Sequence, residues 1–142
     1  MQINSRSKFA ILITLYLSRT GKAVTTREMH QALGISVGYL DQLLASLRRM
    51  EIVKAVRGPG GGYRLARSSD SITAEEIIRA FQDDDEKHPA ECSDEIFMLW
   101  QQFCRHTWLF LGTQTLSEIS GLKENVLDRG NDGNRSLPAH RQ

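Results

Sequence analysis

The sequence of 142 residues has few cysteines and no long apolar run. Its longest apolar stretch, residues 11–17, is far shorter than the roughly 20 residues that a membrane helix needs. The N-terminus lacks the charged, apolar and small-residue order of a signal peptide. A cytoplasmic protein with no membrane partner is therefore expected. Its two cysteines, Cys92 and Cys104, are expected to be free thiols, because structural disulfides are rare in a reducing compartment.

The sequence also lacks the motifs of enzymes. No nucleophile stands beside a general base, and no spacing of catalytic metal ligands occurs. The glycine cluster within residues 57–62 is not followed by the Lys and Ser/Thr of a nucleotide-phosphate loop. The acidic run 83–86 lacks the spaced ligands of a calcium loop, which favours a solvated linker. An enzyme is therefore not expected.

The net charge of +1 hides a strong division along the chain. Residues 1–67 hold three lysines and eight arginines against three acidic residues, a net charge of +8. The remaining residues hold seven basic and 14 acidic groups, a net charge of −7. A basic half joined to an acidic half indicates that the first half meets a polyanion.

Three helices are expected in the basic half. The first covers residues 3–18 and is largely buried. Thr25 and Glu28 have capping-box spacing and begin a second helix that stops at Gly34, and Ser36 can cap a third. The third helix has one apolar face, formed by Leu40, Leu43, Leu44, Leu47 and Met50. Two helices joined by a short glycine turn, the second with a small, polar and basic outer face, are typical of a helix-turn-helix.

A basic, glycine-rich hairpin follows. Residues 52–56 and 63–66 read as short strands around the sequence RGPGGG. Glycines let the backbone take positive φ angles or approach phosphates, Pro59 stiffens the tip, and Arg57 and Arg64 flank it. This pattern predicts a wing that places an arginine in the minor groove. A merely flexible hairpin is the alternative, against which the charge division counts.

The acidic half begins with a short helix that Thr73 and Glu76 can cap. Residues 93–112 predict a long helix that is apolar around more than one face. Such a helix needs two partners, namely its own winged domain and the same helix of a second subunit. Thr115 and Glu118 begin a last short helix, and a disordered tail is expected at residues 122–142.

The expected fold is mainly α with a small β wing, and it divides into four parts. Residues 1–67 form a winged helix-turn-helix DNA-binding domain, and residues 68–92 form a short helix with an acidic linker. Residues 93–121 form a dimerisation helix and a short following helix, and the tail completes the chain.

These residues resemble the iron-sulfur cluster regulators, an IscR-like family of bacterial repressors and activators also called the Rrf-two family. The resemblance covers residues 1 to about 120. It rests on GISVGYLDQL at residues 34–43, VRGPGGGY at residues 56–63, Leu99 with Trp100, and Thr115 with Leu116.

The resemblance implies a homodimer that binds double-stranded DNA at an imperfect palindrome. The residues expected to bind DNA are Ser36, Gly38, Tyr39, Asp41, Gln42, Arg48, Arg49, Arg57, Gly58, Pro59, Gly60 and Arg64. Gln42 can contact a base edge through two hydrogen bonds, Asp41 can accept from cytosine, and Ser36 can bind phosphate. For Tyr39, packing in the core is an equal alternative.

The sequence departs from the family at its sensor. Cluster-binding members carry three cysteines before the long helix and a fourth ligand nearby, whereas this chain offers only Cys92 there. Cys104 would lie about 18 Å further along if Cys92 extended the helix. No cofactor is therefore expected, and Cys104 is read as a buried residue and Cys92 as inert or sensitive to oxidation. A cluster shared across a dimer by Cys92, Cys104, His88 and His106 stays open.

The leading hypothesis is a DNA-binding transcription regulator, most often a repressor in this family. A thiol or iron-sulfur redox sensor is one alternative for its signal. A protein-interaction module on a winged-helix scaffold is another function class, against which the +8 half counts. The operator, the target genes and any small-molecule or protein effector are left open.

Overall fold

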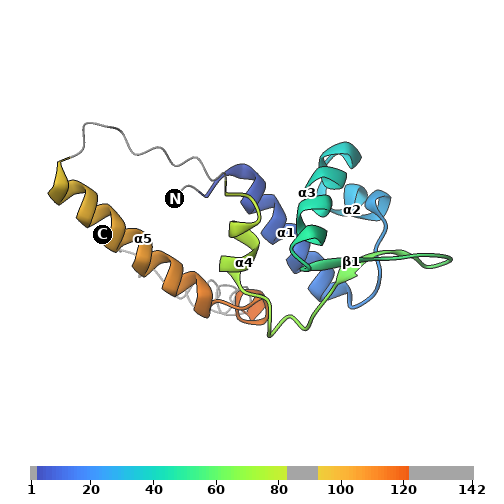
Figure 1. Cartoon of the computed structure of the whole chain (residues 1–142). Helices are drawn as coiled ribbons and strands as arrows, with labels where there is room; N and C mark the ends of the chain where they lie inside the picture. Colours follow the sequence, from blue (N-terminus) through green and yellow to red (C-terminus); the bar gives the residue numbers. More distant parts are fainter. Residues whose placement is uncertain (1–2, 83–92, 122–142) are drawn as a thin grey trace, which may run out of the picture.

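A computed structural model describes residues 3–82 and 93–121, which form a helical domain with one hairpin and a long separate helix (Figure 1). The elements are α1 (Ser5–Thr20), α2 (Thr26–Leu33), α3 (Val37–Arg49), β1 (Val53–Val56), β2 (Gly62–Leu65), α4 (Ala74–Arg79) and α5 (Asp94–Thr113). A further helical turn begins at residue 116. The expected mainly α fold with a small β wing is confirmed, and the element ends differ from the predicted ones by a residue or two.

Side-chain caps decide where several helices begin. The Asn4 side chain accepts the Ser7 backbone N–H at 2.9 Å, so α1 begins after Asn4 rather than at Ile3 as the sequence suggested. The helix ends at Gly21, whose φ of 64° is the left-handed conformation that favours glycine. Thr25 with Glu28, and Thr73 with Glu76, form the two predicted capping boxes.

One apolar core joins α1, α2, α3, the hairpin and α4. Its largest fully buried side chains are Ile13, Met29, Leu40, Leu43, Leu44, Leu47, Ile52, Ile72, Ile77, Ile78, Phe81 and Leu116. Val24 exchanges backbone hydrogen bonds with Tyr63 at 2.8 and 2.7 Å, which ties the segment before α2 to β2. Met50, which the sequence placed on the apolar face of the third helix, is the residue that follows α3 and is 46% exposed; Glu51, at φ 56°, comes next.

The long helix α5 lies apart from this core. In Figure 1 it runs away from the domain, and its end near residue 113 lies beside α4. None of its residues is buried, so the contact with its own domain covers it only in part. Cys104, expected to be buried, is half-exposed. Within residues 3–82 and 93–121, no helix is both long and apolar enough to cross a membrane.

Candidate DNA interface

The outer face of α3 is set by its buried face. Ser36 caps the helix, since its Oγ accepts the Tyr39 backbone N–H at 3.3 Å, and the leucines at positions 40, 43, 44 and 47 hold it on the core. The opposite side is left exposed, namely Gly38, Asp41, Gln42, Ala45, Arg48 and Arg49. Every one of these except Ala45 is a residue that the sequence predicted to contact DNA.

The turn between α2 and α3 is fixed by hydrogen bonds. Gly34, at φ 70°, donates its N–H to the His30 carbonyl at 2.9 Å. The His30 Nδ1 lies 2.8 Å from the carbonyl oxygen of the buried Ile35. A carbonyl oxygen can only accept a hydrogen bond, so Nδ1 is the nitrogen that carries the proton. The sequence pattern did not indicate a role for His30. Its contact ties the last turn of α2 to the segment before α3.

Tyr39 points partly into the domain. Its ring is half-buried against the core and meets the Phe9 ring edge-on, with the centroids 5.8 Å apart and the planes at 88°. The Tyr39 ring is therefore used in packing, and only the exposed part of the side chain is available for a contact with DNA.

The wing between β1 and β2 depends on glycine at several positions. Gly58 and Gly60 have φ angles of 92° and 69°, and Gly61 donates its N–H to the Gly58 carbonyl at 2.9 Å. Gly62 has φ 140°, and a side chain there would collide with the backbone of Val24, which pairs with the neighbouring Tyr63. The glycines therefore shape the loop and allow a third strand segment to approach it.

Positive charge lines the wing. Arg57 follows β1 and is exposed, and Lys54 lies directly opposite Arg64 in the antiparallel register. Two like charges in such a cross-strand pair repel each other, which is a cost that an external polyanion would offset. Six charged side chains on the wing and the outer face of α3 form no ion pair within the described residues. They are Asp41, Arg48, Arg49, Lys54, Arg57 and Arg64. The sequence pattern did not indicate Lys54, because its position opposite Arg64 depends on the strand register.

The expected sensor residues are only partly covered by the structure. His88 and Cys92 lie outside the described residues. Cys104 and His106 are two positions apart on α5, so their side chains point about 160° apart around the helix. In the described ranges no three His, Cys, Asp or Glu side chains gather in a way that could hold a metal ion.

Comparison with known proteins places this arrangement in a family. The model of the Rrf2 family, described as iron-dependent transcriptional regulators, matches residues 3–129. The chain belongs to the Rrf2 family. Its helix-turn-helix and wing are therefore those of a DNA-binding transcriptional regulator, as the sequence predicted, and the prediction that it is not an enzyme is confirmed.

Individual regulators are similar to most of the chain. The transcriptional regulator IscR of Sodalis glossinidius is 34% identical over 150 residues, covering 96% of this chain and 91% of that protein. The structure of CymR, the global cysteine regulator of B. subtilis, is 25% identical with a TM-score of 0.74, covering 86% of this chain and 98% of CymR. IscR of T. potens shares the fold with a TM-score of 0.71 at 23% identity, covering 97% and 94%.

Proposed function

We propose that this Rrf2 member acts as a cytoplasmic homodimer that binds a palindromic operator and represses transcription. The observation that carries the proposal is the outer face of α3 beside the wing, where no charged side chain has an ion-pair partner among the described residues. Unpaired charges on a rigid scaffold are available to DNA without breaking internal bonds.

On each subunit α3 enters the major groove. Gln42 can donate to and accept from one adenine edge, and Asp41 accepts from cytosine and repels bases that present only acceptors. Gly38 leaves room for a base edge beside them, and the Ser36 hydroxyl reaches a phosphate. These roles concern side chains that α3 leaves exposed.

The wing adds contacts next to this groove. Arg57 enters the minor groove, where narrow A·T-rich segments concentrate negative potential. Lys54 and Arg64 neutralise phosphates along the hairpin, while Gly58, Pro59 and Gly60 bring the tip close to the backbone. Arg48 and Arg49, in the last turn of α3, contribute charge rather than base reading.

The dimer forms through the outer face of α5, which we define as Ile96, Leu99, Trp100, Phe103 and Phe110. These side chains are 57%, 68%, 42%, 53% and 61% exposed and follow one side of the helix at spacings of three, four and seven. The Trp100 and Phe103 rings stack with their centroids 5.3 Å apart. A second copy of α5 would remove this apolar stripe from water and set two recognition helices about 34 Å apart.

We further propose that the regulator works without an iron-sulfur cluster. The chain has two cysteines, fewer than the three that cluster-binding relatives place before the long helix, and Cys104 and His106 diverge on α5. Oxidation of a thiol or an unidentified effector would then supply the signal. Anaerobically purified protein is expected to be colourless and iron-free, and stoichiometric iron with visible absorbance would contradict this.

The DNA-binding proposal is tested by replacing Arg57 with Ala. Affinity for a duplex that the protein selects from a random-sequence pool should fall by about 1–3 kcal/mol at fixed salt. Affinity of the unaltered protein should also fall steeply as salt rises, because phosphate contacts release counterions. Arg105→Ala is the matched control, since Arg105 is exposed on α5 and lies opposite its outer face. Equal affinities for both variants would contradict the role of Arg57.

A further inference from the structure

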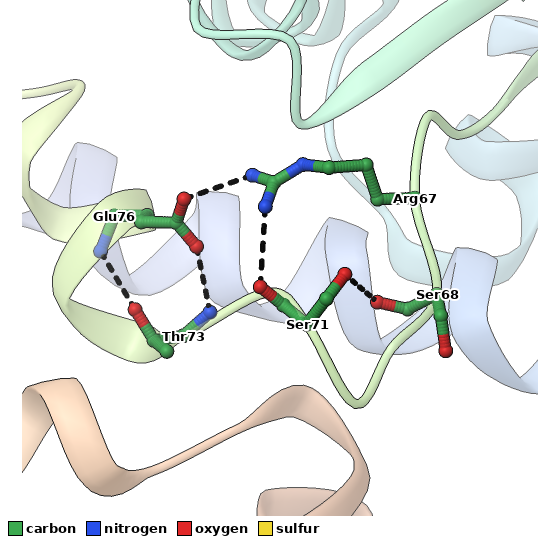
Figure 2. Close-up of polar contacts among 5 residues, drawn as sticks. All are labelled: Arg67, Ser68, Ser71, Thr73 and Glu76. Carbon is green, nitrogen blue, oxygen red and sulfur yellow. Dashed lines mark hydrogen bonds and ion pairs between the residues drawn. The ribbon is translucent and has the colours of Figure 1, made fainter.

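Arg67 links the returning strand of the wing to α4. It follows the end of β2 by two residues, and its guanidinium reaches across the loop (Figure 2). Nη1 donates to the Ser71 carbonyl at 3.1 Å, and Nη2 donates to Glu76 Oε1 at 2.9 Å. The two bonds leave the guanidinium through different nitrogens, so they fix its direction as well as its position.

The carboxylate that Arg67 meets is already part of a helix cap. Glu76 Oε2 accepts the Thr73 backbone N–H at 3.0 Å, and Thr73 Oγ1 accepts the Glu76 backbone N–H at 3.3 Å. Figure 2 shows these bonds side by side with the contact to Arg67. One carboxylate therefore holds both the start of α4 and the strand that returns from the wing.

The same loop is bonded to the segment that follows α5. Ala74 donates its N–H to the Gln114 carbonyl at 2.8 Å, and Leu116 donates to the Ile72 carbonyl at 2.9 Å. One turn further along α4, the Arg79 guanidinium lies 4.2 Å from the centre of the Trp108 ring on α5. The segment of residues 67–76, which includes the first turn of α4, thus follows β2 closely in sequence and is hydrogen-bonded to the residues that follow α5.

We propose that Arg67 is a positioning residue for DNA binding, which sets the wing at a fixed angle to α5 through its ion pair with Glu76. The inference rests on the proposed function, because α5 sets the dimer axis only if the chain dimerises there. If α5 sets the dimer axis, the angle between the wing and α5 decides how far apart the two wings lie on the operator.

Stability alone does not explain the arrangement. The Arg67 and Glu76 side chains are 38% and 39% exposed, and ion pairs at such positions add little to the free energy of folding. A direct phosphate contact is the competing role, since Arg67 also lines a shallow groove with Arg48 and Lys54. The two roles predict different responses to the spacing of the operator halves.

The experiment measures binding to four probes. These are the selected palindromic duplex, versions with one base pair added or removed between the halves, and a single half-site. Arg67→Ala should weaken binding to the selected duplex by about 3- to 30-fold, leave the half-site within about 2-fold, and reduce the preference for the selected spacing. A uniform loss on all four probes would overturn the positioning role.

Two further variants separate the roles if Arg67→Ala folds poorly. Arg67→Lys keeps the charge, but its single ammonium cannot reproduce the two directed bonds, so spacing preference should still fall. Glu76→Gln keeps an acceptor for Thr73 and removes the charge partner, so it should act like Arg67→Ala. If Arg67 bound phosphate instead, Arg67→Lys would bind normally and Glu76→Gln would bind DNA more tightly.

The unaltered protein reports on the proposed function separately. If it binds the half-site as tightly as the palindrome and ignores spacing, the dimer proposal itself fails. If it prefers one spacing and the variants keep that preference unchanged, only the role of Arg67 fails.

Discussion

The domain of α1 to α4 and the helix α5 differ in how completely they bury their apolar residues. The domain encloses an apolar core in which Leu40, Leu44 and Phe81 are at most 2% exposed. The helix α5 buries none of its residues, and large apolar side chains lie on more than one of its sides, including Met98 and Leu109 beyond the outer face. An apolar helix of this kind is stable where another surface covers it. The apolar residues of the domain are thus covered within the chain, whereas those of α5 are left exposed, as the proposed dimer would require.

The domain and α5 also differ in how their helices are capped at the N-terminus. The N-caps Asn4, Thr25, Ser36 and Thr73 each accept a backbone N–H from the first turn of their helices. Ser93 precedes α5 without such a side-chain hydrogen bond. The domain therefore carries its own local start signals, and α5 depends more on what packs against it.

The largest expected effect comes from placing charge on the outer face of α5. The double variant Leu99→Asp, Phe103→Asp should be monomeric, because a dimer would bury two carboxylates per subunit. Its affinity for the selected duplex should fall by about 100-fold or more, since the two halves would no longer be bound by one particle. Sedimentation and fluorescence anisotropy measure the two effects.

Arg105→Asp is the control for this variant, because Arg105 lies on the opposite side of α5. Circular dichroism should show that the domain of the double variant stays folded. A double variant that remains dimeric would show that the subunits meet elsewhere.

The next largest effect is expected from glycine substitutions in the wing, which test how tightly the domain is packed. Gly62→Ala should lower the free energy of unfolding by at least about 2 kcal/mol, because its Cβ would meet the backbone of Val24. Gly58→Ala should cost only about 1 kcal/mol, because its φ of 92° is strained for Ala but the space is open. Urea denaturation compares the two variants, and equal losses would mean that the approach of Val24 is unimportant.

Features that depend on neighbours in sequence could be predicted, and features that depend on the path of the chain could not. The capping boxes of Thr25 and Thr73 involve residues three positions apart, so their spacing is visible in the sequence. The exposed face of α3 follows from helical periodicity in the same way. The collision at Gly62 depends on a segment 38 positions earlier, which no local pattern contains.

The candidate site follows the same division. Arg57 and Gln42 were predicted from a wing and a helix that local patterns define. Lys54 was missed because it faces Arg64 only in the observed strand register, and the pairing of Arg67 with Glu76 depends on how the intervening loop folds back. Side chains that act through a distant partner need the structure to be found.

The smallest expected effect concerns pH and the caps that distinguish the domain from α5. The Thr25 backbone N–H and then its hydroxyl, which both bond to the Glu28 carboxylate, lower the pKa of Glu28 below its usual value of 4.5, and the charge of Lys22 adds to this. When folding lowers the pKa of a carboxyl group, the charged carboxylate stabilises the folded state at every pH above the pKa of the unfolded chain. This stabilisation is lost as the pH falls through the lower pKa of the folded state.

Glu28→Gln keeps an acceptor for the Thr25 N–H but cannot titrate. The melting temperature of the unaltered protein should therefore exceed that of Glu28→Gln at about pH 6, and the difference should become smaller at about pH 3. Ser93→Ala should change the melting temperature at neither pH, because Ser93 makes no cap bond to lose. The difference in melting temperature between the two proteins could instead stay constant with pH. The cap of α2 would then not depend on the charge of Glu28. In that case the contrast between the caps of α2 and α5 would rest on the Thr25 hydroxyl alone.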